Sequence, residues 1–450
     1  SEYSFRSGHF FFSDHQLAMS KAFSAPGKAF LAGGYLVLEP IYDAYVTALS
    51  SRMHAVITPK GTSLKESRIK ISSPQFANGE WEYHISSNTE KPREVQSRIN
   101  PFLEATIFIV LAYIQPTEAF DLEIIIYSDP GYHSQEDTET KTSSNGEKTF
   151  LYHSRAITEV EKTGLGSSAG LVSVVATSLL SHFIPNVIST NKDILHNVAQ
   201  IAHCYAQKKI GSGFDVATAI YGLIVYRRFQ PALINDVFQV LESDPEKFPT
   251  ELKKLIASNW EFKHERCTLP HGIKLLMGDV KGGSETPKLV SRVLQWKKEK
   301  PEESSVVYDQ LNSANLQFMK ELREMREKYD SDPETYIKEL DHSIEPLTVA
   351  IKNIRKGLQA LTQKSEVPIE PDVQTQLLDR CQEIPGCVGG VVPGAGGYDA
   401  IAVLVLENQV GNFKQKTLEN PDYFHNVYWV DLEEQTEGVL EEKPEDYIGL

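Results

Sequence analysis

The chain has 450 residues, of which 41% are hydrophobic and 24% are charged, a composition typical of soluble globular proteins. Its length suits two domains that share a cleft. The formal net charge of −16 argues against a general binder of nucleic acid or of anionic membranes. An anionic ligand must therefore be held locally, by main-chain amides and a few cations. No run of about 18 apolar residues predicts a membrane span.

The four cysteines lack the spacing of a metal site and the density of a disulfide scaffold, so we expect reduced thiols in a cytoplasmic protein. Residues 1–18 lack the basic segment and the sustained apolar run of a secretory signal. We expect them to be an N-terminal extension or a cloning remnant outside the fold. Two domains are then expected, over residues 19–230 and 231–450.

The first domain is predicted to mix strands and helices. Residues 20–38 predict a strand, a tight glycine-rich turn and a second strand, and residues 45–59 and 121–129 predict further strands. The polar stretch 133–148 predicts a solvated loop. The remaining predicted elements are a helix directly after residues 162–170, an amphipathic helix over 193–209, a loop and short helix over 210–222, and a strand over 223–229.

The second domain is predicted to contain long helices. Residues 231–265 predict a polar connection, and residues 273–296 predict a strand, a loop and a helix. The elements expected after these are charged helices at roughly 303–329 and 333–364, a helix over 373–382, and a strand, glycine hairpin and strand over 387–406. This order of elements predicts an α+β fold of two domains.

The sequence KTGLGSSAG, residues 162–170, combines glycines and serines directly before an apolar helix. It matches the dinucleotide-binding fingerprint only formally, because no acidic residue lies between Glu161 and Asp193 to bind a ribose. Its exposed main-chain N–H groups and the following helix dipole suit phosphate oxygens, and Ser167 and Ser168 can donate hydrogen bonds or ligate magnesium. The alternative is a tight turn with a serine N-cap.

Two single charges accompany this loop. Lys28 lies among small residues in SAPGKAFLAGG, where it can reach a ligand or serve as a solvated turn lysine. Asp215 follows the turn of IGSGFDVATA, where it can act on a ligand or stabilise the start of a helix. The glycine-rich segment PGAGGYDA, residues 393–400, can form a wall for phosphate from the second domain.

In this order the three glycine segments resemble the three motifs of the GHMP kinase superfamily, over about residues 20–405. Within it, residues 131–137, 202–219 and 277–290 are similar to the fungal phosphomevalonate kinases. The resemblance implies a two-domain α+β fold with ATP and magnesium in the inter-domain cleft, and 5-phosphomevalonate as the acceptor on the route to isoprenoids and sterols. The turn before Asp215 carries Gly211 where related kinases have proline.

By the same resemblance, Lys28 neutralises the transferring phosphoryl group, Asp215 lies opposite it, and Ser168 ligates magnesium. No other acidic residue lies between Asp193 and Asp215, so nucleotide phosphates and water would supply most metal ligands. The implied ATP-binding residues are Lys162, Thr163, Gly164, Leu165, Gly166, Ser167, Ser168, Ala169 and Gly170. The implied substrate-binding residues are Gly34, Tyr35, His133, Ser134, Ser212, Ser284, Lys288, Gly396 and Gly397.

The acceptor's chemistry predicts the role of the carboxylate. A phosphate monoester has a second pKa of about 6 and is mostly a dianion at neutral pH, so it needs no strong base. Asp215 is therefore expected to orient Lys28 or the metal. Two alternatives stay open: a sibling kinase acting on an alcohol such as mevalonate, and a catalytically inactive ligand sensor on the same fold. We expect a monomer that binds neither nucleic acid nor membranes.

Overall fold

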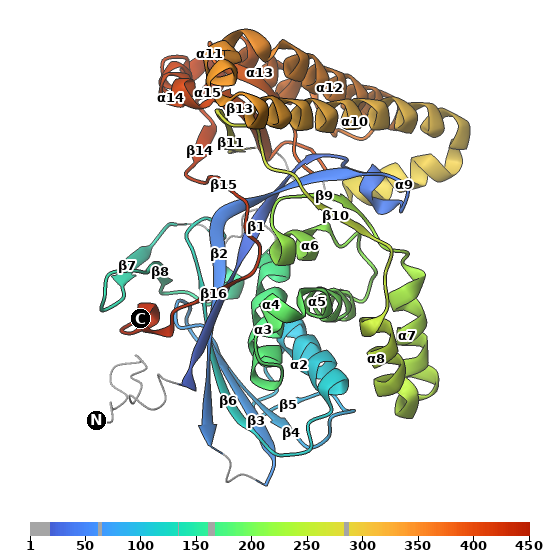
Figure 1. Cartoon of the computed structure of the whole chain (residues 1–450), viewed down its shortest axis with the longest axis vertical. Coiled ribbons are helices and arrows are strands. Elements are labelled where there is room, and N and C mark those ends of the chain that lie inside the picture. Colours follow the sequence, from blue (N-terminus) through green and yellow to red (C-terminus); the bar gives the residue numbers. More distant parts are fainter. Residues whose placement is uncertain (1–18, 62–64, 134, 161–166, 283–287) are drawn as a thin grey trace.

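The computed structural model describes residues 19–61, 65–133, 135–160, 167–282 and 288–450. The predicted N-terminal extension lies outside these residues. Two units are stacked along the long axis of the molecule (Figure 1). One unit is built on a large mixed sheet with helices on one face, and the other on a small antiparallel sheet covered by long helices.

The large sheet is organised by one long strand, β2. Along one edge β2 pairs with β1, and along the other it pairs with β9 near its start and β6 near its end, all antiparallel. The strands of this sheet among the described residues are β1 (Lys21–Ala32), β2 (Ala44–Gly61), β3 (Ser67–Ser72), β4 (Glu80–Ile85), β5 (Arg93–Glu94), β6 (Asp121–Ser128), β9 (Ile224–Arg227), β10 (Lys263–Arg266), β15 (Glu434–Gln435) and β16 (Leu440–Glu442).

Helices cover one face of this sheet, and two more lie outside them (Figure 1). They are α2 (Pro101–Ile114), α3 (Ser167–Phe183), α4 (Val187–Thr190), α5 (Lys192–Gln207), α6 (Phe214–Tyr221), α7 (Ala232–Ser243) and α8 (Phe248–Ala257). Local sequence explains where α2 begins, because the side chain of Asn100 accepts the Leu103 N–H at 3.2 Å and Pro101 occupies the first turn. Helix α3 packs against β1, β2 and α6 in the first unit.

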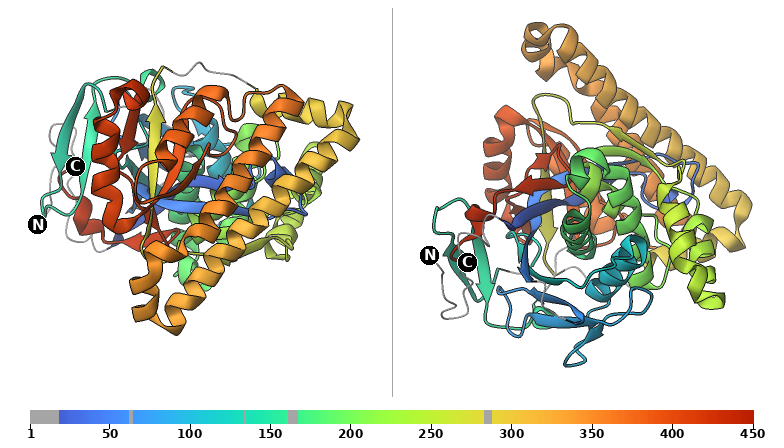
Figure 2. Two further views of the ribbon diagram at one scale, coloured as in Figure 1. Left: turned by 90° about the horizontal axis from the view of Figure 1, so that it is seen from above. Right: turned by 60° about the horizontal axis from the view of Figure 1, so that its bottom comes forward.

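The second unit has the strand order β12-β13-β11-β14. Its strands are β11 (Ile273–Val280), β12 (Cys387–Val391), β13 (Ala400–Leu406) and β14 (Val427–Val430). Its helices are α9 (Leu289–Glu299), α10 (Pro301–Ser331), α11 (Pro333–Ser343), α12 (Glu345–Ser365), α13 (Asp372–Gln382), α14 (Val410–Leu418) and α15 (Pro421–Phe424). Helices α10 and α12 pack side by side (Figure 2). Gly389 in β12 allows the close approach of α12, since a Cβ there would lie 2.9 Å from Ile351.

The two-domain α+β prediction is confirmed, but the prediction of strand, turn and strand over residues 20–38 is wrong. Strand β1 runs unbroken through the glycine-proline segment, with a register shift against β2 between Pro26 and Lys28. Proline has no N–H for the ladder, and the irregularity accommodates it without ending the strand. The expected second strand is the short 3-10 helix η1 (Leu36–Leu38). Lys28 therefore lies on a strand and not in a turn.

Three other predicted segments differ from the structure. The expected solvated loop at 133–148 contains β7 (Thr138–Thr142), which pairs with β8 (Thr149–His153), because its threonines favour a strand. The expected connection at 231–265 contains α7, α8 and β10. The two helices form because their buried apolar residues recur at helical spacing, Ile234 and Val237 in α7 and Phe248, Leu252 and Ile256 in α8. The expected helix over 333–364 is divided into α11 and α12 near Pro346, which cannot donate to a continuous helix.

The C-terminal segment returns to the first unit. Strand β15 pairs with β2 and β16 pairs with β1, and the 3-10 helix η5 (Pro444–Tyr447) stacks its tyrosine on Phe150. The division at residue 230 stays a prediction, with β10, β15 and β16 joining the first sheet from beyond it. The four cysteines are buried and free. Within the described ranges, no helix is both long and apolar enough to cross a membrane.

Candidate active site

Lys28 and Asp215 face one another at the start of α6. The Lys28 side chain is partly buried on β1, and its ammonium lies 5.5 Å from the centre of the Phe214 ring. Burial lowers the pKa of Lys28, and the nearby Asp215 carboxylate partly offsets this by favouring the charged form. Asp215 lies in the first turn of α6 and accepts the main-chain N–H of Val216 at 2.9 Å. The site thus combines a desolvated cation with one carboxylate.

The turn before Asp215 is held by three buried side chains. Arg228 donates to the carbonyl of Gly211 at 2.7 Å, Tyr226 to that of Ser212 at 2.6 Å, and Gln200 to that of Gly213 at 2.7 Å. Gly213 has a φ of +80°, and a Cβ there would lie 2.8 Å from the Gln200 amide. Only glycine fits this left-handed, closely packed position.

These contacts determine which way the main-chain amides of the turn point. In a trans peptide the C=O and N–H groups point in opposite directions, and the described residues contain no cis bond. In each of these three peptides the N–H group, of Ser212, Gly213 or Phe214, points away from the bound carbonyl oxygen of its own peptide. Consecutive N–H groups of this kind form an environment suited to anions.

The N-terminus of α3 presents a second polar group. Ser167 is its first residue, and the Ser168 hydroxyl lies 3.1 Å from Nε2 of His203 on α5. His203 is buried and stacks on Phe102, with ring centres 5.7 Å apart. A Cβ on Gly170 would lie 2.8 Å from Met53, so this glycine lets α3 approach β2. Ala169 is buried, and the predicted ATP-binding residues 162–166 lie outside the described residues.

The predicted substrate residues Gly34 and Tyr35 lie where the two units touch. The Tyr35 hydroxyl donates to the carbonyl of Ala395 at 2.5 Å, and the N–H of Gly394 donates to the carbonyl of Phe30 at 3.2 Å. A Cβ on Gly34 would lie 2.5 Å from the carbonyl oxygen of Gly394. The first and third glycine segments are therefore packed directly against each other, and contact with substrate stays a prediction.

Gly396 and Gly397 have a similar packing role within the second unit. A Cβ on Gly396 would lie 2.4 Å from the carbonyl oxygen of Ile369, and the N–H of Gly397 donates to the same oxygen at 2.8 Å. The Gln374 amide in turn donates to the carbonyl of Gly397 at 3.0 Å. These contacts hold the glycine hairpin in place, and its predicted contact with substrate is not tested by them.

The other predicted acceptor ligands occupy different environments. His133 is buried, with its ring 5.1 Å from Phe76, and Ser212 is buried in the turn before α6. Lys288 is exposed, with a left-handed φ of 66° directly before α9. Ser134 and Ser284 lie outside the described residues. Their predicted roles therefore stay predictions.

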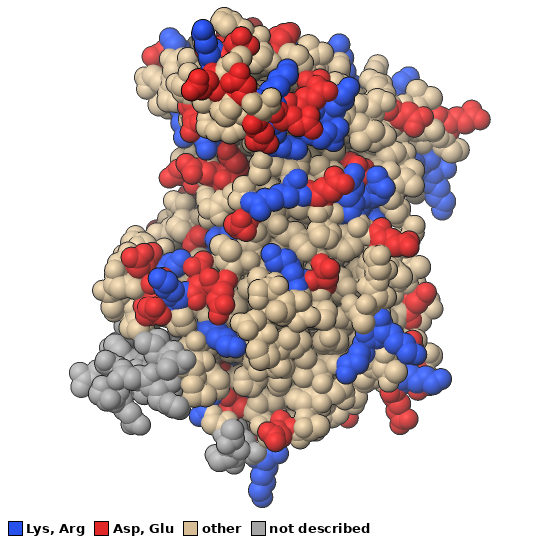
Figure 3. Space-filling model, in the orientation of Figure 1, with Lys and Arg blue, Asp and Glu red and all other residues tan. Residues whose placement is uncertain are grey.

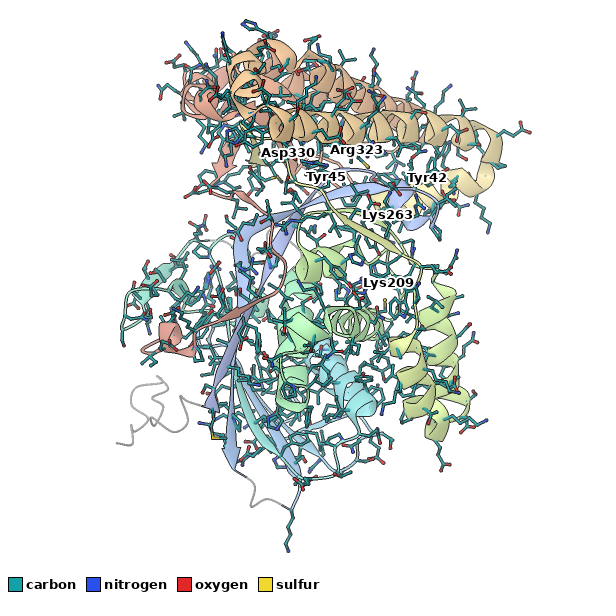
Figure 4. The ribbon with its side chains drawn as sticks, in the orientation of Figure 1. Tyr42, Tyr45, Lys209, Lys263, Arg323 and Asp330 are labelled. Carbon is teal, nitrogen blue, oxygen red and sulfur yellow. The ribbon has the colours of Figure 1, made fainter. Side chains whose placement is uncertain are left out.

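Side chains from both units meet around β2 and α10. Lys297 on α9 forms an ion pair with Glu39, and its ammonium lies 4.9 Å from the centre of the Tyr308 ring. The Tyr45 hydroxyl donates to the carbonyl of Cys267 at 2.9 Å, close to α10 (Figure 4).

On the face shown in Figure 3, acidic and basic side chains are interspersed over both units, so charge there is balanced locally.

Comparisons with known proteins identify the family of this chain. Residues 148–223 match the GHMP kinases N terminal domain. Phosphomevalonate kinase ERG8 of Gibberella zeae is 38% identical over 416 residues, covering 86% of this chain and 88% of the relative. Phosphomevalonate kinase erg8 of Aspergillus fumigatus is 35% identical over 441 residues, covering 86% and 87%. The chain belongs to the phosphomevalonate kinase family. The resemblance seen in the sequence is thereby confirmed.

Solved structures support the fold of a phosphomevalonate kinase. The Streptococcus pneumoniae phosphomevalonate kinase in complex with phosphomevalonate and AMPPNP superposes with a TM-score of 0.60 at 18% identity, covering 92% of this chain and 99% of that one. The Lin0012 protein of Listeria innocua gives a TM-score of 0.66 at 20% identity, covering 94% and 99%. At these identities the likeness concerns the fold alone.

Sequence reasoning missed the buried residues that support this kinase site. Four buried side chains contact either the turn before α6 or the Ser168 hydroxyl: Gln200, His203, Tyr226 and Arg228. In its own segment, each is an ordinary polar residue. Helical spacing gave no signal for two of them, because Gln200 and His203 lie on the side of the predicted amphipathic helix opposite Ile194, Val198 and Ile201. Polar residues need partners when they are buried.

Magnesium fits the groups that the site presents. Among the described residues, no three His, Cys, Asp or Glu side chains cluster in a way that could hold a metal. The oxygen groups of Ser168 and Asp215 are nevertheless the donor type that magnesium prefers, and this ion commonly keeps substrate phosphates and waters as its other ligands. The chemistry of these donors therefore suits a magnesium–nucleotide complex better than a metal held by protein side chains alone.

Proposed function

We propose that this protein transfers the γ-phosphoryl group of ATP to the phosphate of (R)-5-phosphomevalonate, giving (R)-5-diphosphomevalonate and ADP on the mevalonate route to isoprenoids and sterols. Membership of the phosphomevalonate kinase family supports the substrate and the reaction. The observation that carries the proposal is the desolvated Lys28 ammonium coupled to Asp215 in the first turn of α6.

The reaction needs charge neutralisation more than base catalysis. A phosphate oxygen of the acceptor attacks the γ-phosphorus, the bond from that phosphorus to the β,γ-bridging oxygen breaks, and ADP leaves with the electron pair. The acceptor phosphate is already a dianion near neutral pH, so no proton has to be removed from it. Lys28 stabilises charge on the transferring group, as positioned cations do in phosphoryl transfer. Asp215 holds Lys28 charged and oriented.

Magnesium and the acceptor phosphate are assigned to neighbouring groups. Ser168 and Asp215 would hold the ion, which would neutralise the nucleotide phosphates. The N–H groups around Ser212 and Gly213 suit the acceptor phosphate, with His133 and Lys288 as further candidate ligands. We also propose the cytoplasm as the compartment and a monomer as the active form. A relative from Arabidopsis thaliana, 28% identical over 94% of this chain, is named as peroxisomal.

A substrate comparison tests this function. ADP release would be measured with magnesium and ATP against 5-phosphomevalonate, mevalonate, homoserine and galactose, using Lys28→Met as the inactive control. We expect 5-phosphomevalonate to have the highest kcat/KM. A higher value for mevalonate would identify a sibling kinase of the same fold. Binding of 5-phosphomevalonate without turnover of any of the four would identify a ligand sensor.

A further inference from the structure

A chain of buried side-chain hydrogen bonds runs from α8 through α5 to the start of α6. The Asn197 amide donates to the carbonyl of Ile256 at 3.0 Å, and its Oδ1 lies 2.9 Å from Nδ1 of His196. Nε2 of His196 lies 3.0 Å from Nε2 of Gln200, which lies 2.7 Å from the carbonyl oxygen of Gly213. The three side chains of Asn197, His196 and Gln200 are 4%, 0% and 0% exposed.

The direction of every hydrogen bond in this chain is determined by its two ends. A main-chain carbonyl can only accept, so Asn197 must present its NH₂ group to Ile256 and its oxygen to His196. Gln200 must likewise present its NH₂ group to Gly213, and that same nitrogen then donates its second hydrogen to His196. His196 must therefore carry its proton on Nδ1 and accept at Nε2, which makes it a neutral imidazole of one tautomer.

The surroundings of His196 favour this neutral form. Burial lowers its pKa to about 4, an effect that His264 reinforces while Asn197 and Asp193 oppose it. The ring stacks on Phe262, with centres 4.5 Å apart. Protonation at Nε2 would direct an N–H group at the NH₂ group of Gln200, so a charged ring would break the chain at this point.

We infer that Gln200, oriented by neutral His196, is a positioning residue for Asp215. The inference rests on the proposed function, in which Asp215 holds Lys28. The carbonyl that Gln200 binds belongs to Gly213, which also accepts the N–H of Ala217 at 3.0 Å and so begins α6. Asp215 lies in the first turn after that carbonyl. A shift of this turn therefore moves the carboxylate relative to Lys28.

The first test compares two glutamines whose side-chain amides each make two hydrogen bonds. Gln200→Met preserves the volume but removes the donors. Gln115→Met removes an amide that donates to the carbonyls of Leu111 and Ala112 at the end of α2, away from α6. We expect Gln200→Met to lower kcat about 10- to 100-fold, because small displacements at a reacting centre cost this much. The KM for ATP should stay within about twofold, because this turn is not assigned to the nucleotide.

Gln115→Met should leave kcat and both KM values within about twofold of the wild type, whatever its effect on the melting temperature. Equal kcat values for the two variants would overturn the inference, as would a loss in Gln200→Met that appears only in KM. If the wild type used a different acceptor best, the proposed function would fail, and the same pair of variants compared on that acceptor would still decide the role of Gln200.

The second test does not depend on turnover. Nitrogen NMR of histidine-labelled wild-type protein should show His196 protonated at Nδ1 and unprotonated at Nε2 at neutral pH. The opposite tautomer would overturn the chain. A double-mutant cycle of His196→Leu and Gln200→Met should show that the double variant loses no more kcat than Gln200→Met alone, since both act through one path. Independent, multiplicative losses would overturn the link between His196 and Gln200.

Discussion

Lys28 on β1 and Asp215 in the first turn of α6 are electrostatically coupled, and the ring of Phe214 lies directly under the lysine. Phe214 is itself held edge-on by Phe30, with ring centres 4.6 Å apart. The coupling joins the charges of Lys28 and Asp215, and the role of each charge is ambiguous when its own segment is considered alone. Burial disfavours the lysine's charge and lowers its pKa, and the Asp215 carboxylate acts in the opposite direction by favouring the protonated form.

Replacing the lysine tests its role in the transition state. Lys28→Met preserves most of the side-chain length and the contact with Phe214 but removes the charge. We expect kcat to fall on the order of 100- to 1000-fold, the cost of losing one preorganised electrostatic contact. Steady-state kinetics with an ADP-coupled assay, together with an unchanged circular dichroism spectrum, measure this. Near-wild-type activity would remove Lys28 from the mechanism.

Replacing the carboxylate tests whether it acts as a base. In Asp215→Asn the attraction that raises the pKa of Lys28 is lost, so this pKa should fall further and the alkaline limb of the kcat profile should move to lower pH. The acidic limb should persist near about pH 6, the second pKa of the acceptor phosphate. Loss of the acidic limb in Asp215→Asn, with Lys28→Met nearly fully active, would identify Asp215 as the catalytic base.

The serine at the start of α3 is predicted to act through magnesium. Ser168→Ala removes the hydroxyl that His203 contacts and should raise the magnesium concentration needed for half-maximal turnover while leaving the KM for 5-phosphomevalonate unchanged. Titration of magnesium at fixed ATP measures this. Ser178→Ala on the same helix removes a hydroxyl that donates to the carbonyl of Val174 and should change neither value. A rise in acceptor KM with unchanged kcat would place Ser168 at the other substrate.

The C-terminal segment is predicted to depend on one buried arginine. Arg52 donates to Ser24 at 2.8 Å, to Gln435 at 3.2 Å and to the carbonyl of Gly438. Arg52→Met should lower the free energy of unfolding by about 3 kcal/mol, because several buried acceptors lose a charged donor. Denaturant unfolding measures this loss.

A matched change at an exposed arginine serves as the control. Arg266 pairs with Glu437 on the same segment at 3.1 Å, and Arg266→Met should cost less than about 1 kcal/mol. Equal losses for Arg52→Met and Arg266→Met would show that the buried contacts of Arg52 add nothing to the attachment of this segment.

His196 is predicted to make stability depend on pH. Its pKa is lowered by burial from 6.5 to about 4, so between these values the unfolded chain binds a proton that the folded chain excludes. The free energy of unfolding should therefore fall as pH drops from about 6.5 towards 4, by about 3 kcal/mol in total from this group.

Unfolding experiments on two histidine variants would separate this effect from that of other groups. His196→Leu should reduce the slope of stability against pH in this window. His425→Leu, which changes an exposed histidine, should leave the slope as in the wild type. An identical slope in His196→Leu and the wild type would show that His196 is not the titrating group.

The sequence by itself determined the features that depend on local chain properties. Glycines and helical periodicity can be recognised in a single stretch of residues. They identified the glycine-serine segment before α3, the turn before α6 and the glycine hairpin between β12 and β13. Their order along the chain was specific enough to predict the two-domain α+β class and the kinase family. It also singled out Lys28 and Asp215, although it placed the lysine in a turn that does not exist.

Only the tertiary structure decided how these pieces support one another. Three sets of contacts join residues that are distant in sequence or that lie in different elements. Gly34 and Tyr35 pack against the third glycine segment, the C-terminal segment returns to Arg52, and buried side chains donate to the turn before Asp215. A polar side chain such as Gln200 has no preferred role in its own helix. Burial makes an unpaired amide costly, and the fold alone supplies the carbonyl of Gly213 that satisfies it.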